Sequence, residues 1–412
     1  MSCRTVQLLD LPDEILLIIL KKLGSVDVLY SLLNVNKRLD QMARSVDNTK
    51  FLNFSNNNVQ LDRFCCEILP QIQHNIVEVT LEIFSMERIL LACEYSNLTA
   101  IVLTNFLPDI LLQYLTGVDS IERSTVDNNS QKILSNLKEF SLTSYLNTDA
   151  YDCRILPLLR RMPNLESLTF DLYIFRRTII DGLHLNEKLL SHMKYLNKFI
   201  FHICTISKTS ETNYFLTTND IKNTFTNWKY SSVSCGIIHL SHGWSYCHIY
   251  STPFQMTRFM WLSNSFRGQN FSYVTKLSLY DIHPFEYDFF EWLSQACPSL
   301  KDLHIANSTP QKNKRQVATV DDKQICSKIS YLHLFKLNLN YAHMDYVDQF
   351  LCYTNTYLLT FHTLIIQYDK LVTVSNNFTN DAKQINCSQI KQIVFGQLLV
   401  LPKDFYDYFP CL

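Results

Sequence analysis

Glycine is scarce in this chain, with only 7 among 412 residues. No glycine-rich phosphate loop, Gly-x-Ser-x-Gly elbow, His-Glu-x-x-His motif or calcium loop occurs. Charged residues make up 18% and the formal net charge is −1, so no basic field favours nucleic acid or a membrane surface. The sequence therefore predicts no enzyme, no cofactor, no nucleic-acid partner and no membrane partner.

Long apolar runs are also missing. No stretch approaches the ~18 residues of a membrane-spanning helix, and the short apolar run at 15–20 follows acidic residues, unlike a secretory signal. The 13 cysteines have no repeated spacing, which is typical of reduced thiols. We expect an intracellular protein, cytoplasmic or nuclear or both. Its hydrophobic content of 47% supports a large core.

The N-terminal segment contains a strongly apolar helix. Pro12 suits a first turn, and acidic residues at 13 and 14 favour the positive end of the helix dipole. A stripe at three- and four-residue spacing follows: Ile15, Leu16, Ile19, Leu20 and Leu23. Because nearly every side of this helix is apolar, we expect it to be buried on more than one face.

A second helix is expected from Ser25, after a break at Gly24. Its predicted stripe is Val28, Leu32, Val35 and Leu39, with positive residues 37 and 38 near the C-terminal end. About 40 residues cannot bury this much apolar surface by themselves. The excess must be covered by the rest of the chain, as a helical cap, or by another protein.

These residues resemble the F-box family, whose members typically read Leu-Pro-x-Glu-(Ile/Leu), Ile-xxx-Leu, Asp-Leu and Val-Cys-(Lys/Arg)-Arg-(Trp/Leu). The matching positions here are Leu11–Ile15, Ile19–Leu23, Asp27–Val28 and Val35–Leu39, with Asn36 in place of Cys and Leu39 in place of Trp. The resemblance implies an F-box at residues 5–50 that binds a Skp-type adaptor and, through it, a cullin. The implied adaptor surface is Leu11, Pro12, Ile15, Leu16, Ile19, Leu20, Leu32 and Val35.

The remainder of the chain repeats a pattern of apolar residues at positions 1, 4 and 6. The clear copies are Leu137/Phe140/Leu142, Leu165/Leu168/Phe170, Leu196/Phe199/Phe201, Val274/Leu277/Leu279, Leu300/Leu303/Ile305 and Ile329/Leu332/Leu334. Weaker copies are Phe361/Leu364/Ile366, Ile390/Ile393/Phe395, Ile76/Val79/Leu81 and Leu98/Ile101/Leu103. From Leu137 onward, the first positions are 28, 31, 78, 26, 29, 32 and 29 residues apart. Alternation within each copy indicates a strand.

Helix-like stretches separate the copies, at 286–297 and 346–353 for example. A strand and a helix per ~30 residues resembles a leucine-rich repeat. The phrase Pro-x-Leu before the strand, at Pro163 and Pro298, is familiar in F-box/leucine-rich proteins. Position 9, normally Asn or Cys, is Cys only at Cys204. The predicted fold class is therefore α/β, with a short helical F-box followed at 51–412 by an irregular leucine-rich-repeat-like solenoid of parallel strands and helices. Generic parallel α/β structure is the alternative.

The 78-residue gap predicts a hairpin insertion near 231–250, with Gly243 between two strand-like runs. It contains possible zinc ligands in a spacing that is not standard, so packed or exposed hairpin side chains are the better interpretation. They are Cys235, His239, His242, Cys247 and His248.

In a solenoid, positions 3, 5 and 7 of each copy lie on the exposed face of the sheet. This face becomes aromatic toward the C-terminus, where it could anchor a protein partner or lie beneath a loop. The predicted partner-binding residues are Lys276, Tyr280, His304, Tyr331, His333 and Phe335.

The resemblance implies a substrate-recognition subunit of an SCF-type (cullin-RING) ubiquitin ligase. The F-box would bind the Skp-type adaptor, the repeats would bind an unidentified protein substrate, and no residue would be catalytic. The alternative is a non-catalytic scaffold whose helical module caps the solenoid. Neither the substrate nor the number of repeats follows from the sequence.

Overall fold

The computed structural model describes residues 10–55, 60–104, 135–208, 217–240, 243–313, 328–379, 386–396 and 401–412. The chain forms two compact units. Unit 1 is Met1–Ser207, Phe215–Val233 and His248–Tyr250, and unit 2 is Lys208–Tyr214, Ser234–Cys247 and Ser251–Leu412.

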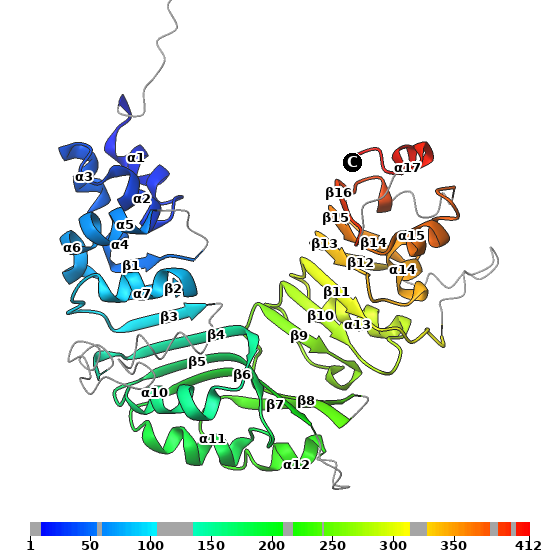
Figure 1. Ribbon diagram of the computed structural model, residues 1–412, viewed down its shortest axis with the longest axis horizontal. Helices are drawn as coiled ribbons and strands as arrows, with labels where there is room; N and C mark the ends of the chain where they lie inside the picture. The colour runs from blue at the N-terminus through cyan, green and yellow to red at the C-terminus, as the bar shows by residue number, and fades with distance from the viewer. Residues whose placement is uncertain are drawn as a thin grey trace, which may run out of the picture. The chain divides into compact units, whose positions relative to one another are not determined.

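Unit 1 begins with four short helices, here called the N-terminal module (Figure 1). They are α1 (Asp13–Leu20), α2 (Ser25–Leu32), α3 (Lys37–Ala43) and α4 (Val46–Lys50). The expected second helix is thus two helices. Asn34 interrupts it with a φ of 67°, and Asn36 starts α3 by accepting a hydrogen bond from the Leu39 amide at 2.9 Å. The positive residues Lys37 and Arg38 consequently lie at the beginning of a helix, and not at its end as expected.

Replacing Asn36 with alanine should lower the free energy of unfolding of unit 1 by about 1 kcal/mol, because the Leu39 amide loses its cap. Chemical denaturation followed by circular dichroism measures this change. Asn36→Ser, which can still cap, is the control and should cost much less. An equal loss in both variants would contradict a capping role.

The module packs on the first strand of the sheet in unit 1. Ser25 at the start of α2 donates a hydrogen bond to the carbonyl of Phe51 at 2.6 Å. The core side chains of the N-terminal module are fully or almost fully buried: Val26, Val28, Leu29, Leu33, Leu39, Met42 and Ala43. The inner surface of the module therefore covers the open end of the sheet, as a cap does.

The first six strands of the sheet in unit 1 are parallel and lie in sequence order. Strands β1 (Phe51–Asn53), β2 (Glu78–Glu82), β3 (Ala100–Thr104), β4 (Glu139–Thr148), β5 (Ser167–Phe175) and β6 (Lys198–Lys208) pair with one another in turn. The fourth position of each copy lies in register across all six strands and is buried. This row is Leu52, Val79, Ile101, Phe140, Leu168 and Phe199. The apolar pattern of the sequence is thus a ladder of stacked side chains.

Short helical segments connect these strands (Figure 1). They are α5 (Leu61–Arg63), a π-helix (Phe64–Ile68), α6 (Leu69–Ile72), a 3-10 turn (Gln73–Asn75), α7 (Ile83–Leu91), a second π-helix (Tyr151–Ile155), α10 (Leu156–Arg160), α11 (Gly182–Lys188), a second 3-10 turn (Leu190–His192) and α12 (Thr218–Asn223). Both α6 and α10 continue directly from a π-helix, and each contains a proline, which has no amide to donate, in its first two residues. Strand–helix alternation with parallel pairing is the architecture of an α/β solenoid.

Residues 231–250 contain strands β7 (Ser232–His239) and β8 (Trp244–Thr252). They extend the sheet, whose order is β1-β2-β3-β4-β5-β6-β8-β7. Gly243 lies between them with a φ of 75°, a left-handed conformation that glycine adopts without strain. The Leu240 amide donates to the carbonyl of Trp244 at 2.7 Å, next to this turn.

Unit 2 holds a second parallel sheet, of order β16-β15-β13-β11-β10-β9. Its strands are β9 (Arg258–Leu262), β10 (Lys276–Tyr280), β11 (Asp302–Ala306), β13 (Lys336–Asn338), β15 (Thr363–Ile365) and β16 (Gln392–Val394), with a 3-10 turn (Asn264–Phe266) after β9. Helices α13 (Tyr287–Ala296), α14 (Met344–Leu351) and α15 (Tyr368–Ser375) lie on one side of it (Figure 1). A two-stranded parallel pair, β12 (Ile329–Tyr331) with β14 (Thr356–Leu358), accompanies these repeats. The helices expected at 286–297 and 346–353 are confirmed as α13 and α14.

One predicted repeat is out of register. The expected copy Ile329/Leu332/Leu334 is wrong, because Leu332 is 53% exposed while Leu334, Leu337 and Leu339 are fully buried. The strand that pairs with β11 is β13, where Leu303 faces Leu337. The correct apolar triplet therefore starts five residues later.

One asparagine of unit 2 bonds backbone groups in a turn, as the position-9 asparagine of a leucine-rich repeat does. It is Asn307, which lies one position earlier, at position 8 of its repeat. It is buried, donates to the carbonyl of His283 at 2.7 Å and accepts from the Thr309 amide at 2.8 Å.

The C-terminal helix is α17 (Lys403–Tyr408), and its Phe405 and Tyr408 are buried. The ring of Phe405 lies 5.4 Å from that of Phe378. These aromatic contacts attach α17 to the last repeats of this unit.

Candidate functional site

The most prominent exposed apolar surface of the N-terminal module is one face of α1 and its extension, here called the α1 face. Its residues are Ile15, Ile18, Ile19 and Leu23, which are 44%, 57%, 38% and 54% exposed. They recur at three- and four-residue spacing, so they lie along one side of the helix. Large aliphatic side chains gathered in this way on a soluble surface mark an interaction site more often than isolated ones do.

The opposite side of α1 faces the interior of the module. Leu16 and Leu20 are 2% and 7% exposed. The expectation that these two residues contact a partner directly is therefore corrected, since burial within the module leaves them no surface to offer. Their packing holds the helix so that Ile15 and Ile19 point away from the core.

Arg38 fixes the start of α1 against α3. Its Nε donates to Asp13 Oδ1 at 2.7 Å, and its Nη2 donates to the carbonyl of Leu11 at 2.6 Å. The ion pair is exposed on both sides, and such pairs contribute little to stability. Their value here is geometric, because two bonds from a planar guanidinium orient the chain where it enters the helix.

The other predicted adaptor residues lie around α1. Pro12 is exposed, Leu11 and Leu32 are half-buried, and Val35 is 59% exposed in the turn between α2 and α3. Exposed charges are found at both ends of α1, acidic at Asp10, Asp13 and Glu14 and basic at Lys21 and Lys22. The α1 face thus has a polar surrounding of both signs, which suits a specific protein partner.

Ile18 and Leu23 are not among the predicted adaptor residues, although they are two of the most exposed apolar side chains of the α1 face. The signal that could have found them is a second stripe, since positions 15, 18 and 19 obey helical spacing as well as 16 and 20 do. In a helix that is apolar on every side, spacing cannot say which stripe faces inward.

The predicted partner-binding residues of unit 2 are only partly brought together. Lys276 is exposed at the start of β10, while Tyr280 and His304 are half-buried at outward positions of β10 and β11. Tyr331 is 3% exposed and donates to the carbonyl of Phe290 at 3.1 Å. Its assignment to the exposed face is therefore wrong, and it follows from the misplaced register described above.

His333 and Phe335 are both exposed, but they precede β13 and do not lie within it. Phe335 is 47% exposed and stacks on the ring of His362, with centroids 4.4 Å apart and planes 16° apart. Lys336 and Asn338 occupy the outward positions that the prediction gave to other residues. Cation and aromatic groups therefore lie at the beginning of the strands.

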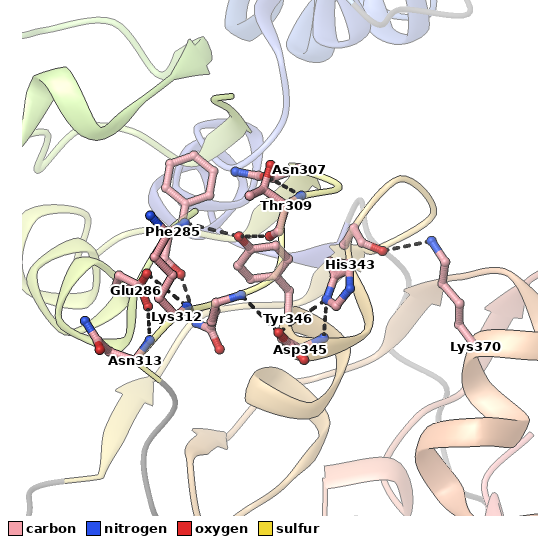
Figure 2. Close-up of polar contacts among 12 residues, drawn as sticks. Phe285, Glu286, Asn307, Thr309, Lys312, Asn313, His343, Asp345, Tyr346 and Lys370 are labelled. Atoms are coloured by element: carbon pink, nitrogen blue, oxygen red, sulfur yellow. Dashed lines mark hydrogen bonds and ion pairs between the residues drawn. The ribbon is translucent and has the colours of Figure 1, made fainter. Parts of the chain in front are cut away.

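Behind the exposed face, polar side chains support the loops that leave the strands of unit 2 (Figure 2). The Tyr346 hydroxyl donates to the carbonyl of Thr309 at 2.8 Å and accepts from the Phe285 amide at 3.1 Å. Burial raises the pKa of Tyr346 above its ordinary value of 10.0. A tyrosine that is kept neutral and bonded on both sides holds backbone and does not transfer protons.

The neighbouring contacts in Figure 2 have the same character. The carboxylate of Glu286 accepts from the backbone amides of Lys312 and Asn313, at 3.1 and 2.9 Å. Lys370 donates to the carbonyls of Asn340 and Ala342, at 3.0 and 2.8 Å. Because the charged groups of Glu286 and Lys370 are both hydrogen-bonded to main-chain atoms, we interpret this cluster as structural.

Unit 1 contains a second polar cluster, which is entirely buried. Nδ1 of His202 lies 2.8 Å from Asp171 Oδ1, its Nε2 lies 3.0 Å from His248 Nδ1, and His248 Nε2 lies 3.5 Å from Cys204 Sγ. All four side chains are at most 2% exposed. A thiol, two imidazoles and a carboxylate resemble a nucleophilic relay, but complete burial denies a substrate access to the thiol.

The possible zinc ligands differ in how far they are buried. Cys235 and Cys247 are buried, His239 is exposed, and His248 belongs to the buried cluster of unit 1; His242 lies outside the described residues. In the described part of the chain, no three histidine, cysteine or acidic side chains are placed to hold a metal ion. Among the helices with described residues, none is long and apolar enough to cross a membrane.

Comparisons with known proteins provide fold-level likeness at most. No protein-family model matches the chain, and no curated protein sequence matches it. A chain in the crystal structure of the Rad7 and Elc1 complex in yeast is similar at 13% identity, with a TM-score of 0.37 over 86% of each chain. At this identity and TM-score the likeness assigns no function. The parallel α/β solenoid stands on the strand pairing of the chain itself.

Proposed function

We propose that this chain is a non-catalytic substrate receptor of a modular ubiquitin ligase of the SCF type. The α1 face would bind a Skp-type adaptor, and the repeats would hold a protein substrate. The observation that carries this proposal is the exposure of Ile15, Ile18, Ile19 and Leu23 on a module whose core is already filled by other residues. The α1 face lies within a segment that resembles an F-box, and this resemblance supports a Skp-type adaptor as the partner.

The division of labour within the module supports this function. A helix that served only to cap the sheet would turn its apolar side inward and a polar side outward. Here α2 and α4 lie against β1 and supply the cap, whereas α1 presents aliphatic side chains to solvent. Ligation would require no residue of this chain, because a receptor acts by bringing the substrate close to a catalytic subunit.

The alternative is a scaffold whose module is only a cap. The observation that favours it is the close packing of α2 on β1, through Ser25 and the buried residues of both elements. The two functions differ in one property, since the scaffold has no reason to bind an adaptor. Adaptor binding therefore separates them.

The test is co-expression of the full chain with a Skp-type adaptor, followed by calorimetric titration. The wild type should form a stable complex, and Ile15→Asp with Ile19→Asp should weaken it about thirtyfold or more, because two charges would replace apolar contacts. Both residues are exposed in the free chain, so the double variant should keep its folded circular dichroism spectrum.

The matched control is Leu183→Asp with Tyr273→Asp, two exposed apolar residues elsewhere, at 58% and 57% exposure. It adds the same charge and should bind the adaptor like the wild type. No complex with the wild type would favour the scaffold. Equal binding by the α1-face variant would show that the adaptor uses another surface.

A further inference from the structure

The beginning of the strands in unit 2 forms an edge that we call the strand-entry edge. Its first row follows the register of the sheet: Arg258, Lys276, Asp302, Lys336, Thr363 and Gln392. The preceding row is joined by amide-to-carbonyl bonds: Thr257, Thr275, Lys301, Phe335, His362 and Lys391. These two rows contain five lysines and arginines but one carboxylate.

The same two rows of unit 1 provide an internal comparison. They are Phe51, Glu78, Ala100, Glu139, Ser167 and Lys198, preceded by Lys50, Val77, Thr99, Lys138, Glu166 and Asn197. These two rows contain three lysines and three glutamates. The charges at these two repeat positions therefore cancel in unit 1 but are mostly positive in unit 2, although the whole chain has a net charge of −1.

The lysines of the strand-entry edge are available for a partner. Lys276, Lys301 and Lys391 are exposed, and no residue in the described ranges forms an ion pair with any of them. Lys336 is paired with Asp302, but at 3.7 Å and with 41% of its side chain exposed. Such a pair is weak and can be exchanged for a better one.

An apolar anchor lies among these cations. Phe335 follows Lys301 in the same row, and its exposed ring is held by stacking on His362. Lys391 continues that row beyond His362. A segment crossing the strands would therefore meet a cation, an aromatic ring and a second cation in turn.

We propose that the strand-entry edge binds an acidic peptide segment in which an apolar residue is flanked by aspartates or glutamates. Strands are ~4.8 Å apart, so six strands span roughly 24 Å, the length of about seven extended residues. Nucleic acid fits less well, since a pI of about 6.8 gives no general basic field. As the substrate surface of a receptor, the edge rests on the proposed function, but it lies in unit 2 and the α1 face lies in unit 1.

The test uses the full chain without any adaptor, so its result is independent of adaptor binding. The probe is a fluorescein-labelled peptide, Glu-Glu-Asp-Phe-Glu-Glu-Asp-Phe-Glu-Glu, measured by fluorescence anisotropy at low and at physiological salt. The wild type should bind it, more weakly as salt rises. Lys301→Glu with Lys391→Glu should weaken binding about tenfold or more, and Lys276→Glu with Lys336→Glu should act similarly.

The matched control is Lys50→Glu with Lys198→Glu, which changes the net charge equally at exposed positions of unit 1. It should bind within about twofold of the wild type. Replacing Phe by Ala in the peptide should weaken binding for the wild type but much less for Phe335→Ala, if the two rings meet.

Three results would overturn the proposal. One is the absence of peptide binding by the wild type. Another is an equal loss of affinity in the unit 1 control. The third is tighter binding of a DNA duplex than of the peptide, abolished by the same lysine variants, which would make the edge a nucleic-acid surface. None of these results bears on adaptor binding, and a failed adaptor titration would leave peptide binding measurable.

Discussion

Replacing Phe290 with alanine should lower the free energy of unfolding of unit 2 by about 3–5 kcal/mol. The side chain is completely buried in α13, and its ring centroid lies 5.1 Å from that of Phe350 and 6.0 Å from that of Tyr346. Both partners belong to the next repeat helix, α14. Removal of the ring would leave a cavity between two repeats that stacked neighbours cannot fill by collapsing. Urea denaturation followed by circular dichroism measures the loss.

Two controls accompany this experiment. Phe290→Leu keeps most of the volume and should cost only about 1–2 kcal/mol. Tyr273→Ala removes an aromatic ring that is 57% exposed and should change stability by at most about 0.5 kcal/mol. If Phe290→Ala cost no more than Tyr273→Ala, the packing of α13 on α14 described above would be incorrect.

Unit 1 should lose stability as the pH falls below about 6.5, because of its buried histidine cluster. Burial, and then the neighbouring His202, hold the pKa of His248 well below its ordinary value of 6.5. When a histidine has a lower pKa in the folded chain than in the unfolded chain, the unfolded chain is protonated at a higher pH. Below pH 6.5 the unfolded state therefore binds more protons than the folded state. The stabilisation is complete above pH 6.5 and is lost as the pH falls from there to the folded pKa. For one histidine this loss is at most about 1.4 kcal/mol per pH unit, and it continues until the pH reaches the folded pKa.

The contribution of His248 can be isolated by comparing unfolding at pH 7.5 and pH 5. His248→Phe gives up contacts with His202 and Cys204, so it should be about 1–3 kcal/mol less stable at pH 7.5. Its stability should nevertheless fall less steeply on acidification than that of the wild type, by up to about 1.4 kcal/mol per pH unit. The control His192→Phe, at an exposed position, should keep the wild-type slope. An unchanged slope in His248→Phe would place the acid sensitivity elsewhere.

The repeat architecture of the chain was predictable where the apolar pattern was unambiguous. At Leu165, Leu168 and Phe170 the three positions are buried, and Leu168 stacks between Phe140 and Phe199 as expected. Inward side chains two apart on a strand permit only one face toward the core, which fixes the register locally. The parallel pairing then follows from the intervening helices.

The pattern failed where two registers fit equally well. Residues 329–339 contain apolar side chains at both Ile329/Leu332/Leu334 and Leu334/Leu337/Leu339. Only the second places a strand beside β11, with Leu337 opposite Leu303, while Ile329 pairs with Thr356 in a separate two-stranded sheet. Pairing partners far along the chain decided between them, and a single sequence contains no record of such pairs.

The two proposed interaction surfaces show the same division. Composition and spacing predict that the N-terminal module has more apolar surface than it can bury and that strands and helices alternate in repeats, because both are local properties of the chain. The folded structure was needed to show that Leu16 and Leu20 face inward while Ile18 and Leu23 face outward. It also decided that Lys276, Lys301, Lys336 and Lys391 share one edge. These residues are separated by whole repeats, and stacking of the strands is what brings them together.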